Sequence, residues 1–376
     1  MAYEKKKIGF RPTWAEVDLS ALACNFCRVR KIVDPKIKIM ATIKADAYGH
    51  GLIPVGKLLE RQGVDCFGVA SIDEGMNLRA AGITVPIVVL GLILKEDVEP
   101  LFTYRLIPTI SSYDFAFALD KKARALRQGL AVHVKVDTGM GRIGARQAEA
   151  LQLIARIRRL PRLAIEGVFT HFAFADMDRE FTNYQIRLFN RLLAQLAHQG
   201  LRVPLAHAAN SMGLIGYANS HFTMVRPGLV LYGLHPSEKL PVTFKPVLSL
   251  KTRVVYVKRV PKGTGISYGH AYVTPRATTI VTLPIGYGDG YPRNLSNAGP
   301  VLINGRRFTI CGKICMDQIM VDVGNARVRP GDEAVLIGSQ KNARIIVEEL
   351  AALAGTIPYE IVCGLGSRIP RVYLGA

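Results

Sequence analysis

The sequence predicts a (β/α)8 barrel of the α/β class followed by an all-β carboxyl-terminal domain. Strand-like and helix-like segments alternate over the first 240 residues, which is the pattern of such barrels. From about residue 241 the segments become short, alternate apolar with polar residues and break at Gly, Pro and Asn. A doubly wound open sheet is the alternative for the first part, but no GxGxxG follows a strand there, which argues against a dinucleotide fold. We therefore predict a barrel over residues 1–240 and a β-domain over residues 241–376.

An opening strand, TWAEVDL, and a helix precede the barrel pattern. Barrel strands are predicted near residues 37–44, 65–71, 85–93, 106–111, 130–137, 164–172, 204–209 and 223–231. Helices such as IDEGMNLRAAG and YDFAFALDKKARALRQG lie between them, with apolar residues three and four apart and a final glycine of the kind that ends helices. The boundary is predicted in SEKLPVTFKP, and one helix, near residues 345–354, interrupts the β-domain.

Composition excludes several classes of protein. No apolar run approaches the roughly 20 residues of a membrane-spanning helix. MAYEKKKIGF has no apolar segment behind its charges, as a secretory signal would have. Six cysteines in 376 residues are too few for a disulfide scaffold, and Cys24 and Cys27 lie in a helix-like stretch without a second pair at zinc spacing. We therefore expect a soluble, cytoplasmic protein that needs no metal.

The chain carries 49 Lys and Arg against 29 Asp and Glu, a formal net charge of +20. Such a charge invites a nucleic-acid partner. The basic residues are scattered in separate patches, however, such as KKARALRQG and RIRRLPR, without interleaved aromatic residues or a recognisable nucleic-acid motif. We expect a basic solvated surface that attracts small anions, with no specific nucleic acid and no membrane as partner.

Polar residues that could carry chemistry follow the predicted barrel strands. Active sites of these barrels lie at the carboxyl ends of the strands. The residues at those ends are Lys44 after the first strand, Asp137 and Arg142 after the fifth, His171 and Asp176 at the sixth, Asn210 and Ser211 after the seventh, and Arg226 and Gly228 in the eighth. Any one of them alone is as readily a capping or loop residue, but together they are expected to converge on one mouth.

Lys44 indicates the chemistry of that mouth. A lysine at the end of an apolar strand, with no carboxylate immediately beside it, can be desolvated and act as an amine nucleophile that forms a Schiff base with a carbonyl. Pyridoxal phosphate also needs a phosphate site, which barrels often build from the loops after strands seven and eight. Those loops offer Ser211 and the backbone of Gly228 and Leu229, and Tyr48 could donate to a phosphate oxygen.

Several long segments carry a resemblance to a known family. They are IKADAYGHG, KVDTGMGRIG, EGVFTHFAFAD, HAANS, VRPGLVLYG, GISYGHAY, LPIGYGDGYPR, CGKICMDQIMVD and CGLGSRIPRVY. On these motifs, which occur in the family's order nearly end to end, the chain resembles the alanine racemases, pyridoxal-phosphate enzymes built from a barrel and a β-domain. The resemblance implies an isomerase that interconverts L-alanine and D-alanine and supplies D-alanine for peptidoglycan.

The resemblance also implies roles for single residues. Lys44 would hold pyridoxal 5'-phosphate, and racemisation would proceed through an external aldimine with a base on each face of the Cα carbon. Lys44 would serve one face and Tyr268 the other. In the family that tyrosine reaches the mouth of the partner subunit, which implies a homodimer with shared active sites. His171 and Arg226 would assist Tyr268, and Arg226 would donate to the pyridine nitrogen.

Further residues take their roles from the resemblance alone. Arg142 would lie near the phenolic oxygen of the cofactor and the substrate carboxylate. The backbone of Met316 would make a second carboxylate contact, with Asp317 orienting that part of the site. Lys135 matches a lysine that is carbamylated in some members; otherwise it is an ordinary lysine paired with Asp137. Residues expected along the access channel are Asp176, Arg293 and Lys313.

Two departures from the family pattern bear on substrate choice. Ser367, in CGLGSRIPR, stands where many members carry a tyrosine that helps hold the phosphate and narrows the channel. Lys313 stands where an arginine is common. We expect alanine to be the best substrate, with more tolerance for serine than members with the tyrosine show.

Four alternatives remain open at the level of sequence. A broad-specificity amino-acid racemase would share Lys44 and Tyr268 and differ in pocket size. A barrel decarboxylase for basic amino acids needs a cysteine-bearing acidic loop, whereas CMDQIMVD has the racemase pattern. A non-catalytic cofactor-binding barrel would lack residues 241–376. A nucleic-acid binder is suggested by the net charge alone.

Overall fold

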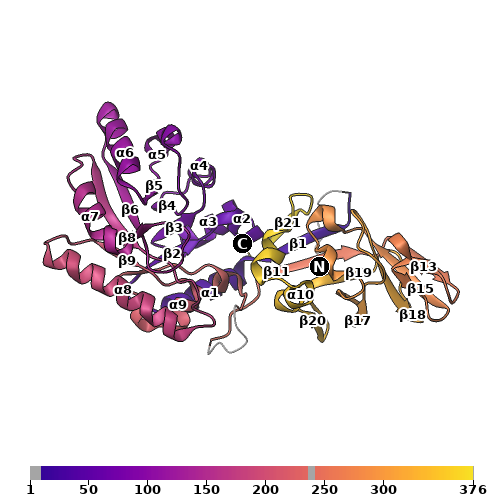
Figure 1. Cartoon of the computed structure of the whole chain (residues 1–376). Coiled ribbons are helices and arrows are strands. Elements are labelled where there is room, and N and C mark those ends of the chain that lie inside the picture. Colours follow the sequence, from indigo (N-terminus) through magenta and orange to yellow (C-terminus); the bar gives the residue numbers. More distant parts are fainter. Residues whose placement is uncertain (1–9, 236–241, 376) are drawn as a thin grey trace.

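Parallel strands form a closed barrel in the first part of the chain, as predicted. The computed structural model describes residues 10–235 and 242–375, and Figure 1 shows the barrel joined to an elongated β-domain. Within the described residues the eight barrel strands follow the order β5-β4-β3-β2-β10-β9-β8-β6, and pairing of β5 with β6 closes the ring. The prediction of a (β/α)8 barrel is therefore confirmed.

The barrel strands are short and almost fully buried. Their bounds are β2 (Lys38–Thr42), β3 (Cys66–Val69), β4 (Ile87–Val89), β5 (Ile107–Ile110), β6 (Leu130–Asp137), β8 (Leu163–Phe169), β9 (Leu205–His207) and β10 (Met224–Val225). The two-residue strand β7 (Ala145–Arg146) pairs with the end of β6. Side chains fill the barrel interior and helices cover the outside, so both faces of each strand favour apolar residues.

Helices connect the barrel strands, and several of them begin at side-chain caps. Their bounds are α1 (Leu19–Ile32), α2 (Lys44–Gly49), α3 (Leu52–Arg61), α4 (Ile72–Ala80), α5 (Glu99–Thr103), α6 (Tyr113–Leu126), α7 (Gln147–Ile157), α8 (Arg179–His198) and α9 (Ser211–Gly216). Ser112 caps α6 by accepting the N–H of Phe115, and Asp178 caps α8 by accepting that of Phe181. These caps fix where the capped helices begin.

The eighth strand is shorter than the sequence predicts. Instead of one strand over residues 223–231, β10 ends at Val225 and Leu229–Tyr232 form a 3-10 helix, η3. Pro227 has no N–H to donate to a strand ladder, and Gly228 turns the chain with φ of −130° and ψ of −86°. Arg226 and Gly228 therefore lie just beyond the strand, not in it.

The carboxyl-terminal part is built from β-sheet, as predicted. Its strands are β11 (Leu248–Arg253), β12 (Tyr256–Val260), β13 (Gly265–Ile266), β14 (Tyr272–Val273), β15 (Thr278–Leu283), β16 (Pro300–Ile303), β17 (Arg306–Thr309), β18 (Ile319–Gly324), β19 (Glu333–Gln340), β20 (Ala343–Ile345) and β21 (Arg371–Leu374). The large sheet has the order β17-β16-β19-β11-β1-β21, and β12-β15-β18 form a second sheet. Helix α10 (Val347–Ala354) matches the predicted one, whereas α11 (Pro358–Cys363) is not predicted.

The opening strand belongs to the large sheet of the β-domain and not to the barrel. β1 (Thr13–Asp18) pairs antiparallel with β11 and parallel with β21. The predicted barrel domain of residues 1–240 therefore includes a first strand that the structure places in the sheet of the β-domain. The predicted boundary at residues 240–241 falls in the segment 236–241, which lies outside the described residues.

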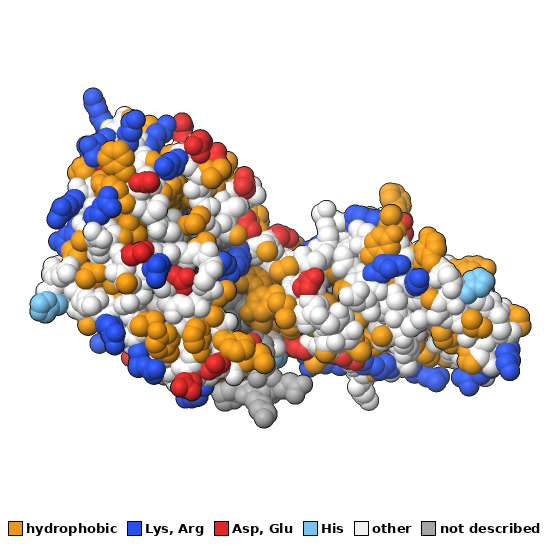
Figure 2. Space-filling view, in the orientation of Figure 1, with side chains coloured by type: hydrophobic (Ala, Val, Ile, Leu, Met, Phe, Trp, Pro, Cys, Tyr) orange, Lys and Arg blue, Asp and Glu red, His pale blue; other side chains and the backbone are white. Residues whose placement is uncertain are grey.

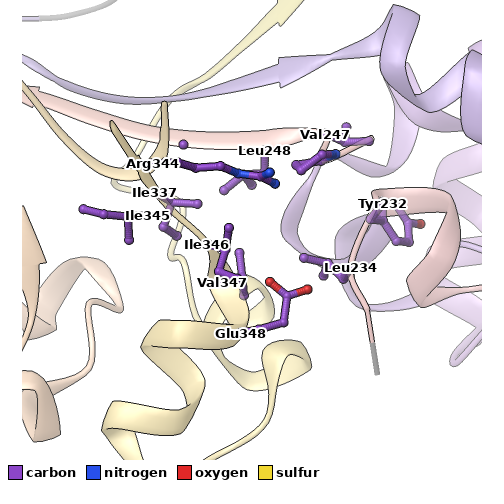
Figure 3. Close-up of a pocket in the computed structure, with 13 residues that line it drawn as sticks. Tyr232, Leu234, Val247, Leu248, Ile337, Arg344, Ile345, Ile346, Val347 and Glu348 are labelled. Carbon is purple, nitrogen blue, oxygen red and sulfur yellow. The ribbon is translucent and has the colours of Figure 1, made fainter. Parts of the chain in front are cut away.

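Polar contacts hold the junction between the barrel and the β-domain. A cavity of about 20 Å3 lies between Tyr232, Val247 and Glu348 (Figure 3). The Glu348 carboxylate accepts the N–H of His235 at 2.7 Å, and the buried amide of Asn25 donates to the chain on both sides of the junction. The cavity has room for about one water molecule, so it belongs to the packing of the junction and not to a ligand site.

Charged side chains are distributed over both parts of the molecule. Figure 2 shows Lys and Arg spread over the barrel and the β-domain, with Asp and Glu between them. None of the helices in the described ranges is both long and apolar enough to span a membrane.

Candidate active site

Lys44 lies just beyond the carboxyl end of β2, where a left-handed turn begins. Residues 45–48 have φ between +53° and +55° and ψ between +41° and +54°. This conformation costs an L-residue about 1–2 kcal/mol, so other contacts must hold it. The Glu74 carboxylate accepts the N–H of the first of these residues at 2.6 Å, and Asp46 accepts the N–H of Leu52 at 2.7 Å. The turn thereby fixes the direction in which Lys44 leaves the strand.

The surroundings of Lys44 favour its neutral amine. Burial lowers the pKa of Lys44 below its ordinary value, and the guanidinium groups of Arg142 and Arg226 lower it further. Glu74 and Cys363 oppose this shift. A lysine with a lowered pKa carries more of the neutral amine at a given pH, and the neutral amine is the nucleophile.

Arg226 is buried in the barrel mouth, and its guanidinium group donates hydrogen bonds to four fixed acceptors. Its Nη1 donates to Nδ1 of His207 at 2.8 Å. Its Nη2 donates to the carbonyls of Thr170 at 2.7 Å and Ala208 at 2.9 Å, and at 3.3 Å to Nδ1 of His171. Burial lowers the pKa of Arg226 to about 9, so the guanidinium remains charged at neutral pH.

A chain of two histidines continues inward from Arg226. Because the guanidinium can only donate, Nδ1 of His207 must accept, and the proton of this ring lies on Nε2. That Nε2 is 2.9 Å from Nδ1 of His133, so His133 accepts in turn and carries its own proton on Nε2. The last nitrogen is buried without a hydrogen-bond partner among the described residues. These hydrogen bonds keep both imidazoles neutral beside the charged guanidinium group of Arg226.

The predicted phosphate residues meet in one cradle. Ser211 Oγ accepts the N–H of Gly228 at 3.1 Å and that of Val230 at 3.4 Å. A Cβ on Gly228 would lie 2.7 Å from the Tyr48 hydroxyl, so only glycine allows this close approach. The N–H of Gly228 is thus used internally, whereas that of Leu229 has no partner among the hydrogen bonds of residues 10–235 and 242–375. Leu229 at the start of η3, with the Tyr48 and Ser211 hydroxyls, can donate to an anion.

Lys135 and His171 lie in the same positive surroundings. Lys135 is 2% exposed, and its Nζ lies 4.6 Å from the centre of the Phe169 ring. Burial and the charges of Arg226 and Arg142 hold the pKa of Lys135 well below its usual range. The same causes lower the pKa of His171. The Asp137 carboxylate accepts a cluster of backbone N–H groups in its own loop, and no Lys135–Asp137 salt bridge occurs in the described part of the chain.

Three predicted site residues lie together on the β-domain and not in the mouth of the barrel. Tyr268 begins the 3-10 turn η4 (Tyr268–His270), just after β13, and β13 lies at the end of the β-domain farthest from the barrel (Figure 1). Tyr268 and Met316 are 64% and 52% exposed. The Ser267 hydroxyl donates to the carbonyl of Lys313 at 2.6 Å, which ties the tyrosine turn to the segment that carries Met316 and Asp317. The predicted channel residues Asp176, Arg293 and Lys313, and Ser367, are exposed.

Sequence reasoning missed several residues in and around the barrel mouth. His207 lies in the quoted HAANS motif, but its link to His133 joins two strands that are far apart in sequence. Tyr359 places its ring 5.8 Å from that of Tyr48. Cys363 is exposed at the end of α11 and close enough to Lys44 to affect its pKa.

Comparison with known proteins identifies the family. The family model "Alanine racemase, N-terminal domain" matches residues 17–236, and "Alanine racemase, C-terminal domain" matches residues 247–373. The chain belongs to the alanine racemase family. The resemblance seen in the sequence motifs is therefore confirmed, and with it membership of a family of isomerases.

Relatives named alanine racemase match along almost the whole chain. One from Halothermothrix orenii is 50% identical over 367 residues, which covers 96% of this chain and 97% of that protein. One from Carboxydothermus hydrogenoformans is 47% identical over 369 residues, covering 97% and 100%. An alanine racemase function is thus supported across both parts of the chain.

Solved structures of alanine racemases share the fold. That of Clostridium difficile 630 has a TM-score of 0.93 at 38% identity and covers 98% of this chain and 97% of that chain. The Bacillus anthracis enzyme with bound L-Ala-P has a TM-score of 0.92 at 35% identity, covering 97% and 96%. The Bartonella henselae enzyme, described with covalently bound pyridoxal phosphate, has a TM-score of 0.88 at 30% identity, covering 97% and 100%.

The buried histidine chain makes stability depend on pH. Burial and Arg226 lower the pKa of His133 to about 3 in the folded protein, against about 6.5 in an unfolded chain. Between these values the unfolded chain binds a proton that the folded chain does not, so stability falls as the pH is lowered through this window. From pH 7 to pH 5, His133 alone contributes a loss of about 2 kcal/mol. In His133→Gln the loss of unfolding free energy between pH 7 and pH 5 should be smaller by about 2 kcal/mol. Urea unfolding at both pH values measures this difference.

The control for this prediction is His198→Gln, because His198 is exposed at the end of α8. This variant should show the pH dependence of the unsubstituted chain. An unchanged pH dependence in the His133 variant would contradict the assignment.

Proposed function

We propose that this chain racemises alanine with pyridoxal phosphate bound through Lys44. The observation that carries the proposal is the position of Lys44, which has a lowered pKa and lies in the same barrel mouth as Arg226 and the Tyr48–Ser211 cradle. The family supports the reaction, and the solved relative with covalently bound pyridoxal phosphate supports the cofactor.

The residues present fit the cofactor. The Tyr48 and Ser211 hydroxyls and the N–H of Leu229 would hold the phosphate, and Arg226 would donate to the pyridine nitrogen. A Cβ at Gly228 would fill the cradle, which explains the glycine. When bound, pyridoxal phosphate acts as an electron sink that acidifies the Cα–H of an attached amino acid. Because Arg226 is held by four acceptors and stays charged, it would donate a hydrogen bond to the pyridine nitrogen without giving up a proton.

Two groups would move the proton at the Cα atom. Lys44 Nζ would take or return it on one face, and the Tyr268 hydroxyl on the other. A tyrosine has a reference pKa of about 10, so it needs nearby positive charge or donors to act as a base. Arg226 supplies the charge. His171, whose pKa is lowered, would connect Arg226 to the tyrosine.

The distance of Tyr268 from the barrel suggests a second chain. Its turn follows β13 at the far end of the β-domain (Figure 1), and the residue is largely exposed. We propose a homodimer in which Tyr268, Met316 and Asp317 of one subunit complete the barrel mouth of the other. We also propose that the enzyme acts in the cytoplasm and has the family's usual role, which is to supply D-alanine for peptidoglycan.

The substrate carboxylate would bind between two groups. Arg142 is exposed at the mouth and close enough to Lys44 to lower its pKa. The N–H of Met316 would donate from the partner subunit. Lys135, with a lowered pKa between Arg142 and Arg226, fits the carbamylation known from some members, because a neutral amine reacts with carbon dioxide and the resulting anion would lie between two cations.

The first test is spectroscopic. The purified chain with pyridoxal phosphate should show a visible absorption band. Borohydride should bleach this band as it reduces the C=N bond and leaves the cofactor permanently attached to Lys44, and solvent deuterium should enter the α-position of L-alanine as D-alanine forms. Lys44→Ala should lose the band and at least about 10^3-fold in rate, since it removes both the attachment and one base. Lys57→Ala, at another lysine of the barrel, should change neither. A chain that shows no band after the cofactor is added would refute the proposal.

Shared sites predict activity from mixing two inactive chains. When Lys44→Ala and Tyr268→Phe chains are refolded together, each mixed dimer contains one site with both an intact lysine and an intact tyrosine. About a quarter of the unsubstituted activity should return, because half of the dimers are mixed and half of their sites are complete. Activity is measured as D-alanine formed per total protein. If both residues came from one chain, mixing would restore nothing.

Serine is the test of substrate breadth, which separates alanine racemisation from a broad-specificity racemase. Ser367 is exposed where many relatives carry a tyrosine. We expect measurable serine turnover, slower than that of alanine, and expect Ser367→Tyr to lower kcat/KM for serine about tenfold more than for alanine, in line with the discrimination a smaller pocket provides. Rates on both amino acids check this. A chain without detectable serine turnover would refute the wider pocket.

A further inference from the structure

Asp289 is a fully buried carboxylate held between two arginines from distant parts of the chain. It ends the 3-10 turn η5 (Tyr287–Asp289) and has an exposed fraction of 0%. Both Nη groups of Arg11, just before β1, donate to its two oxygens. Nε of Arg368, just before β21, lies 3.3 Å from Oδ1. The carboxylate also accepts the N–H of Gly286 at 3.0 Å.

The turn that Asp289 organises is bonded to the segment carrying Met316. The N–H of Tyr287 donates to the carbonyl of Cys315 at 3.1 Å, and the N–H of Gly288 donates to the carbonyl of Met316 at 2.9 Å. The two backbones lie so close that a Cβ on Gly286 would be 2.1 Å from the Cys315 oxygen. The position of the turn therefore determines the position of these two carbonyls.

These bonds also fix the direction of the Met316 N–H. A trans peptide unit is planar, so its C=O and N–H point in opposite directions. The carbonyl of Cys315 points to the turn, and the N–H of Met316 in the same peptide unit must point away from it. Met316 is 52% exposed, and within the described ranges its N–H has no hydrogen-bond partner. It is a fixed and available donor in the segment that is hydrogen-bonded to the Tyr268 turn.

The two arginines hold the other side of Met316 as well. Arg11 Nη2 donates to the carbonyl of Asp317 at 3.2 Å. Arg368 Nη2 donates to Oδ1 of Asp317 at 2.6 Å. Both peptide units that flank Met316 are thus tied, directly or through the turn, to the same buried carboxylate.

We propose that Asp289, with Arg11 and Arg368, positions the Met316 N–H to receive the carboxylate of the amino acid substrate. This inference rests on the proposed function, which assigns that contact to Met316. These three are positioning residues, because they act through the backbone of residues 315–317 and touch neither substrate nor cofactor. The cluster links substrate affinity to residues at both ends of the chain.

Asp289→Asn is the main test. The amide keeps an acceptor for the Gly286 N–H but loses the charge that holds two guanidinium groups. We expect KM for L-alanine to rise about tenfold, which corresponds to the lower end of the free-energy range of a hydrogen bond to a charged group. The value of kcat should change less than about threefold. Ethylamine, an amine without a carboxylate, provides the second readout. Its dissociation constant, from the change in the visible band of the holoenzyme, should not change.

Matched variants control for structural damage. Asp120→Asn removes another fully buried carboxylate, paired with Arg124 on α6, and should leave KM for alanine unchanged. If Asp289→Asn does not fold, Arg11→Met and Arg11→Lys replace it: the first should raise KM, and the second, which keeps the charge, should restore part of the affinity.

The outcomes separate this inference from the function on which it rests. An unchanged KM in the folded Asp289 or Arg11 variant would overturn the inference, as would equal losses for alanine and ethylamine, and either result leaves the racemase assignment intact. Failure of the unsubstituted chain to racemise alanine would instead overturn the proposed function.

Discussion

The site depends on the left-handed turn that follows Lys44. Four consecutive residues without a glycine among them adopt a conformation that costs about 1–2 kcal/mol each, so the turn persists only because its surroundings over-determine it. Glu74 and Asp46 accept N–H groups in and beyond it, and Nδ1 of the buried His50 lies 2.8 Å from the Tyr48 carbonyl. A right-handed helix starting at the same point would carry Tyr48 in a different direction and separate it from Gly228.

The β-domain completes that support, which gives it a structural role in its own barrel. A Cβ on Gly49 would lie 2.2 Å from the Val362 carbonyl of α11, and one on Gly51 would lie 1.9 Å from the Tyr373 hydroxyl of β21. Arg371, also in β21, donates to the carbonyl of Gly49 at 3.1 Å. Because β21 pairs with β1, the opening strand anchors the sheet against which the lysine turn is built. The two parts are therefore a single structural unit around Lys44.

Most of the barrel could be predicted from the sequence, because strand and helix periodicity is local. The end of the eighth strand was predictable only in part, since Pro227 and Gly228 break it and the apolar run continues past them. The left-handed turn and the place of β1 were not predictable, because both depend in part on contacts with the last strand, β21, more than 300 positions away. Residues at strand ends, such as Arg226, were placed in the mouth correctly. Their inner neighbour His133 was missed, since no motif marks it.

The electrostatics of the mouth favour the neutral amine of Lys44. Arg226 is fully charged yet surrounded by neutral acceptors, and Arg142 adds a second charge. Both guanidinium groups lower the pKa of Lys44 and Lys135. Within the described structure neither lysine forms an ion pair with a carboxylate. The same positive field favours an anionic ligand. An anion bound there would in turn raise the pKa of Lys44, so the binding of a phosphate or a carboxylate and the protonation of the lysine are coupled. The mouth therefore favours the neutral amine of Lys44 when no anion is bound and favours proton uptake by this lysine once an anion has bound.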